Sequence, residues 1–114
     1  MSIKIIQDRI SKNVLEQAAA ESFGTMVKAV VDIEDGIMAL GGELHADAEA
    51  ELLQIGSVNE NLWGINIYPA QPPADRIEYI SLINIRSSQG NQTMEVENQS
   101  VRDRIKQIVD KLIE

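Results

Sequence analysis

The sequence predicts an α+β fold in which three helices pack mainly on one face of an antiparallel sheet, as a two-layer structure. Two observations lead to this prediction: two pairs of β-branched runs are each joined by turn residues, and three segments carry apolar residues at helical spacing. The predicted order is strand, helix, hairpin, helix, hairpin, helix, which is typical of an antiparallel sheet with helices packed against it. A chain of 114 residues can build one core, so residues 1–114 are predicted to form a single compact domain.

The amino-terminal part is predicted to be a short strand followed by a helix. Isoleucines at positions 3, 5 and 6 indicate the strand. Ser11 is a suitable N-cap, and Gly24 follows the last apolar residue of the helical pattern. The helix is therefore expected over residues 11–23.

A hairpin and an acidic helix follow in the predicted order. Residues 26–34 and 37–44 are the two strands, because Asp35 and Gly36 between them are a strong signal for a tight turn. Apolar residues then recur at helical spacing until Gly56, which predicts a short helix near residues 47–55.

The second hairpin is predicted from residues 62–68 and 77–86, joined by a proline-rich connection. Ser100, with Asp103 three residues later, resembles a capping box. The apolar positions that follow predict an amphipathic carboxy-terminal helix covering one face of the sheet.

The charge is distributed unevenly along the chain. The net charge is -8, and residues 29–75 contain no lysine or arginine. The acids in this stretch are Asp32, Glu34, Asp35, Glu43, Asp47, Glu49, Glu51, Glu60 and Asp75. Such a surface repels a phosphate backbone, so nucleic-acid binding is disfavoured and a cation or a basic protein partner is favoured.

Two further features of the composition exclude classes of protein. The chain has no cysteine, which excludes disulfides, thiolate metal sites and cysteine nucleophiles. Its apolar runs are far shorter than a membrane span, and its amino terminus lacks the apolar core of a signal peptide. We therefore expect no association with a membrane and a cytoplasmic location.

Alternation along the second hairpin predicts a polar ligand site on an open sheet face. If the isoleucines flanking Asn66 and Asn84 pack beneath the helices, then Asn66, Tyr68, Asn84 and Arg86 share the other face, joined by Lys28 and Asp32 of the first hairpin. Asparagine is disfavoured in strands, so its occurrence at two matched positions favours a specific role. The alternative is an ordinary solvated face of an antiparallel sheet.

The segment of residues 41–49 is dense in polar residues and contains the only histidine. Glu43, His45, Asp47 and Glu49 are the candidate ligands of a divalent metal, and His45 with Glu43 are the candidate catalytic residues, since histidine titrates near neutral pH. The alternative is a strand end followed by an acidic helix amino terminus, which the helix dipole favours.

A long polar connection after residue 86 is a candidate anion site. Arg86, Ser87, Ser88, Gln89 and Asn91 offer a guanidinium, hydroxyls and amides next to the flexible Gly90. The segment has neither Walker nor dinucleotide-binding spacing, so a plain surface loop is the alternative.

Three blocks of the sequence resemble a small prokaryotic family of unknown function: GGELHADAE at residues 41–49, LWGINIYP at 62–69 and SQGN at 88–91. The resemblance extends over nearly the whole chain. It implies a compact domain, and it carries no activity, cofactor or partner.

These observations favour a small-molecule or anion-binding domain, with metal-assisted catalysis left open, whose site joins residues 43–49, the two asparagines and the connection after residue 86. The alternative is a protein-interaction or homo-oligomeric module without catalysis, in which the anionic half or a strand edge meets a partner.

Overall fold

The computed structural model describes residues 2–114. Its strands and helices in chain order are β1 (Ile3–Ile6), α1 (Lys12–Glu21), β2 (Val27–Asp32), β3 (Ile37–Gly41), α2 (His45–Gln54), β4 (Leu62–Ile67), β5 (Ile77–Glu78) and α3 (Gln99–Leu112). The five strands form one antiparallel sheet in the order β1-β3-β2-β4-β5. The predicted α+β class and antiparallel sheet are confirmed.

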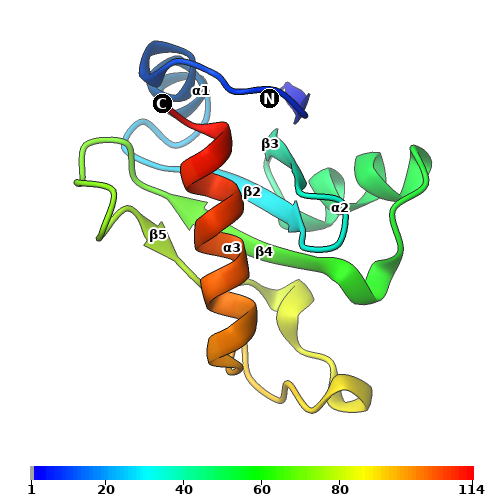
Figure 1. Cartoon of the computed structure of the whole chain (residues 1–114). Helices are drawn as coiled ribbons and strands as arrows, with labels where there is room; N and C mark the ends of the chain where they lie inside the picture. The colour runs from blue at the N-terminus through cyan, green and yellow to red at the C-terminus, as the bar shows by residue number, and fades with distance from the viewer. Residues whose placement is uncertain (1) are drawn as a thin grey trace.

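Helices α1 and α3 cover one face of the sheet, and Figure 1 shows α3 lying across the strands β2 and β4. The main core forms between them because alternate residues of each strand point to this face. Its members include Leu15 from α1, Ile65 from β4 and Ile105 from α3, all of them buried. Two of the three helices thus share one face, in agreement with the prediction.

The other face of the sheet is covered as well, which corrects the expectation of an open face. Ala48 and Leu52 of α2 pack with Val30, Ala39 and Leu62 in a second buried cluster, and Ile83 joins it from beyond β5. Every residue of β4 is buried in consequence. A polar side chain on this face therefore lies in an enclosed site.

The predicted strand over residues 77–86 is wrong after Glu78. The chain leaves the sheet there and forms a 3-10 turn over Leu82–Asn84, which the Ser81 hydroxyl caps by accepting a hydrogen bond from the Ile83 N–H. A serine that bonds its own backbone in this way competes with strand pairing. The turn brings residues 80–84 back over β4.

Helix α3 begins at a different cap from the predicted one. The Asn98 side chain accepts hydrogen bonds from the backbone N–H groups of Ser100 and Val101 at 2.8 and 3.2 Å, so Asn98 and not Ser100 is the N-cap. Asn98→Ala is expected to lower the free energy of unfolding by about 1 kcal/mol in urea unfolding. Ser100→Ala is the control, and a larger loss in this control than in Asn98→Ala would contradict the assignment.

Candidate functional site

Asn84 is part of the sheet's internal bonding. It is fully buried, its amide oxygen accepts from the Gly64 N–H at 2.8 Å, and its amide nitrogen donates to the Gly64 and Met94 carbonyls at 3.0 and 3.1 Å. The side chain therefore bonds β4 as a neighbouring strand would. Both N–H donors of this amide and one lone pair of its oxygen are used within the protein, so it offers no free donor to a ligand.

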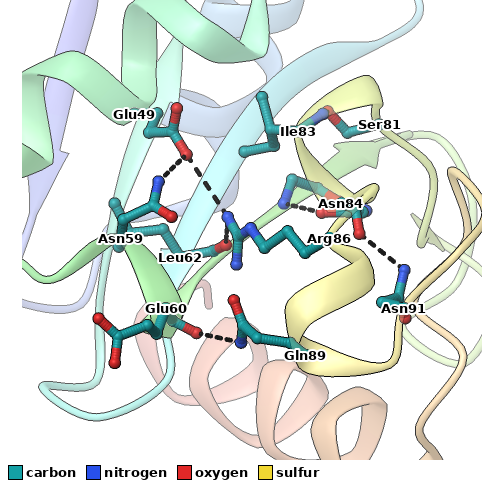
Figure 2. A network of polar contacts seen from close by, with 11 residues as sticks. Glu49, Asn59, Glu60, Leu62, Ser81, Ile83, Asn84, Arg86, Gln89 and Asn91 are labelled. Carbon is teal, nitrogen blue, oxygen red and sulfur yellow. Dashed lines mark hydrogen bonds and ion pairs between the residues drawn. The ribbon is translucent and has the colours of Figure 1, made fainter.

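Arg86 connects α2 to the start of β4, as Figure 2 shows. Its Nη2 donates to the carbonyl of Leu62 and lies 3.5 Å from a carboxylate oxygen of Glu49, while its guanidinium stacks 4.9 Å from the Trp63 ring centre. Burial lowers the pKa of Arg86, and the charge of Glu49 opposes this effect. Arg86 is thus engaged with the protein itself, although its Nη1 has no partner among the described residues.

The rest of the predicted anion loop is divided between surface and interior. Ser87 and Ser88 are exposed, and Gln89 donates to the Glu60 carbonyl at 3.0 Å. Asn91 is buried: its amide nitrogen donates to three backbone carbonyls, including that of Asn84 at 2.7 Å, and its oxygen accepts from a backbone N–H. The loop is held by these bonds and presents no convergent set of free donors.

The predicted metal ligands do not come together. Glu43 and Asp47 are exposed, Glu49 turns to Arg86, and the ring of His45 points to the backbone of β4. Within residues 2–114 no three acidic or histidine side chains are grouped closely enough to hold a metal ion.

His45 and Asn66 do come together, in a pocket of about 380 Å³ between α2, β2, β4 and the turn after β5. We call it the His45 pocket. Its polar members are Lys28, His45, Asn66 and Ser81, and its apolar members are Met26, Leu44, Ala46, Ile80, Leu82, Ile83 and Met94. Mostly apolar walls with a few convergent polar groups are typical of small-molecule sites.

Asn66 supplies a buried oxygen that is not hydrogen-bonded. Its amide nitrogen donates to Glu78 at 2.8 Å and to the Ile80 carbonyl at 3.4 Å, which sets the orientation of the amide. The oxygen on the other side has no partner among the described residues, although the residue is only 8% exposed. Tyr68 also lies beside Glu78, and its hydroxyl donates to the same Glu78 carboxylate at 3.4 Å.

His45 begins α2 and is buried against β4. Its Nε2 lies 2.8 Å from the Ile65 carbonyl, and because a carbonyl only accepts, Nε2 carries the proton. Nδ1 then carries a lone pair and can accept a hydrogen bond. Burial lowers the pKa of His45; the bond to Ile65 opposes this, the charge of Lys28 lowers the pKa further, and the neighbouring Asn66 amide again opposes.

This lowered pKa predicts a pH-dependent stability. In the unfolded chain His45 titrates near ~6.5. Because the folded protein binds this proton more weakly, His45 contributes its full stabilisation above that pH, and the contribution decreases as the pH falls through ~6.5 towards the folded pKa. Urea unfolding from pH 7.5 to 5.0 should show this decrease, and His45→Gln, which can keep a donor to Ile65, should remove it. An unchanged profile in the variant would contradict the buried neutral histidine.

Another cavity of about 380 Å³ lies beside Gly90 and is lined in part by Glu60, Trp63, Gln89 and Glu97. The Trp63 indole N–H has no partner among the described residues. Glu97 accepts hydrogen bonds from Thr93 and Gln92, which lower its pKa. This cavity has the acidic side chains of Glu60 and Glu97 in its wall, whereas the His45 pocket combines mostly apolar walls with Lys28, His45 and Asn66 from three separate elements, in addition to Ser81.

The fold and the pocket together define an α+β protein with a five-stranded antiparallel sheet and a partly open pocket with polar groups between the sheet and helix α2. A family model described as "Protein of unknown function (DUF5674)" matches residues 4–112, so the chain belongs to this family. The predicted membership of a family of unknown function is confirmed. Comparison with curated proteins and with solved structures gave no match. None of the helices in residues 2–114 has the length and apolar character needed to cross a membrane.

Proposed function

We propose that this protein is a small-molecule-binding domain and that the His45 pocket is its ligand site. The observation that carries the proposal is the convergence of Lys28, His45 and Asn66 on a mostly apolar pocket, where the amide oxygen of Asn66 is buried without a partner among the described residues. An unsatisfied buried acceptor costs about 1 to 3 kcal/mol. A ligand donor that reaches this oxygen would offset that cost.

The three polar groups come from three different elements: Lys28 from β2, His45 from α2 and Asn66 from β4. Strands and helices hold side chains more firmly than loops do. The apolar wall contributed by Leu82 and Ile83 is held in place through Asn84, whose bonds to Gly64 fix this turn against β4. The site is therefore largely formed before a ligand arrives.

A variant that fills the pocket tests the proposal. Ala46 lines the pocket yet is exposed, so Ala46→Phe should fold normally and obstruct the cavity. We expect fragments that bind to shift the amide signals of residues in the His45 pocket in 1H–15N spectra. Ala46→Phe should lower the affinity of these fragments at least tenfold. Ala50→Phe is the matched control, one helical turn further along α2 on an exposed position.

Fragments that bind Ala46→Phe as well as the parent, or that perturb only residues around Gly90, would overturn the proposal. Broad loss of dispersion in Ala46→Phe but not in Ala50→Phe would indicate misfolding. In that case Leu82→Trp, at a position 71% exposed on the same rim, replaces it as the obstructing variant.

A second candidate function is a homo-oligomeric or protein-interaction module without catalysis. Leu44, Leu82 and Met94 are 56%, 71% and 40% exposed at the mouth of the same pocket, and such an apolar rim favours contact with a second copy of the chain. The net charge of -8 opposes self-association. Sedimentation velocity decides between the two: a dimer that Leu82→Ser dissociates favours the module, and a monomer favours the binding domain.

A further inference from the structure

One positive, one neutral and one negative side chain lie in a row across the sheet, on the face that α2 covers. Lys28 of β2 is the direct register partner of Asn66 of β4, and Asn66 is in turn the partner of Glu78 of β5. Residues paired directly across antiparallel strands share a face, with their side chains about 5 Å apart. The row therefore places an ammonium, an amide and a carboxylate in sequence.

The centre of this row accepts a hydrogen-bond donor. Glu78 and the Ile80 carbonyl occupy the amide nitrogen of Asn66, so only its oxygen remains, and an oxygen of this kind only accepts. His45 adds a second acceptor at Nδ1, since its Nε2 is bound to Ile65. A ligand group in contact with this end must carry an N–H or O–H.

The Lys28 side of the row attracts a negative charge. Its ammonium lies 5.3 Å from the Phe23 ring centre and is close enough to His45 to lower the pKa of that histidine. Leu44 at the N-cap of α2 supplies no side-chain acceptor, and the helix amino terminus is the positive end of its dipole, although the charge of Asp47 in the first turn partly offsets this attraction. A single carboxylate fits here, whereas a multiply charged anion is repelled by Glu78 at the other end of the row.

We propose that the ligand is a small carboxylic acid with a hydrogen-bond donor on the neighbouring carbon and an apolar side chain, that is, a 2-amino or 2-hydroxy acid. Its carboxylate pairs with Lys28, its donor bonds to Asn66 Oδ1 and His45 Nδ1, and its side chain packs against Met26, Leu82 and Met94. This inference rests on the proposed function and specifies the ligand class of the same site.

Calorimetry at pH 7.5 with four related compounds tests the three contacts separately. L-Leucine and 2-hydroxy-4-methylpentanoate have all three features, 4-methylpentanoate lacks the donor, and L-leucinamide lacks the carboxylate. L-Leucine or 2-hydroxy-4-methylpentanoate should bind ten times more tightly than either 4-methylpentanoate or L-leucinamide. Which of the two acids binds more tightly shows whether the donor is an amino or a hydroxyl group.

Replacing a lysine by methionine removes the positive charge and keeps the aliphatic part of the side chain, so two such variants test the role of Lys28. Lys28→Met should abolish the preference for the acid over L-leucinamide, while Lys4→Met on the exposed part of β1 should preserve it. The 1H–15N spectrum of each variant establishes that it is folded. Should Lys28→Met unfold the chain, the comparison of the four compounds on the parent protein still decides the question.

Equal affinity for L-leucine and 4-methylpentanoate would overturn the role of the donor, and equal affinity for the acid and L-leucinamide would overturn that of Lys28. If none of the four compounds binds but other fragments enter the His45 pocket, the ligand class is wrong and the proposed function stands. If no fragment enters the pocket, the proposed function fails with it.

Discussion

Replacing Asn84 by alanine is expected to lower the free energy of unfolding by about 3 kcal/mol or more, the sum of two buried backbone groups left unpaired. The N–H and the carbonyl of Gly64 both lose their side-chain partner, whereas the Met94 carbonyl still accepts a hydrogen bond from the Ser81 N–H. Asn84 is completely buried, so water cannot readily replace these bonds. Since folded domains have only about 5 to 15 kcal/mol of stability, the midpoint of urea unfolding should fall markedly.

Asn59→Ala is the control for this substitution. Asn59 is exposed, and its amide donates to Glu49 at 3.2 Å on the surface, so its loss should cost less than about 0.5 kcal/mol. Similar losses for the two variants would contradict the role of Asn84 as a substitute for strand pairing. Retained stability in Asn84→Ala with weakened fragment binding would instead assign Asn84 to the site.

Gly64→Ala is the second substitution with a large expected effect. It should lower the free energy of unfolding by about 2 to 3 kcal/mol, because the added methyl group overpacks the interior. A Cβ on Gly64 would lie 2.5 Å from the Cβ and 2.6 Å from the Oγ of Ser81, and 3.1 Å from Cγ1 of Ile83. The Ser81 Cβ is fixed to its backbone, so the turn over Leu82–Asn84 must shift away from β4. Binding in the His45 pocket should weaken together with stability, because Leu82 and Ile83 form its wall.

A double-mutant cycle measures whether this clash is the cause. Ser81→Gly removes both of the closest atoms, so Gly64→Ala should cost at least 1 kcal/mol less in the Ser81→Gly background than in the parent, within the usual range of coupling between contacting residues. Chemical denaturation of the four proteins gives the coupling energy. Additive losses would show that the turn does not pack on Gly64 as described.

The sequence predicts the first half of the fold well because its signals there are local. Asp35 and Gly36 form the turn of a hairpin, and Ser11 caps α1 as expected. The second half depends on contacts between distant residues. The tripeptide Ile-Asn-Ile occurs at 65–67 in a strand and at 83–85 around a 3-10 turn, so no local pattern distinguishes the two copies.

The candidate site was predicted in part. Alternation placed Lys28 with Asn66, and the segment 43–49 that holds His45 was expected to join them; all three residues line one pocket, which α2 partly covers. Asn84 and Asn91 carry the same kind of polar side chain but use it to bond the backbone. Apolar walls such as Met26 and Met94 have no sequence signal, because only the return of the chain over β4 makes them neighbours.

The proposed site depends on two unpaired acceptors at its polar end, and His45 reports on one of them directly. As the only histidine of the chain, it gives a single set of imidazole signals in a long-range 1H–15N spectrum at pH 7.5. The structure predicts a neutral ring with the proton on Nε2 and a free lone pair on Nδ1. A proton on Nδ1 instead, or a doubly protonated ring at this pH, would contradict the acceptor on which the proposed ligand class depends.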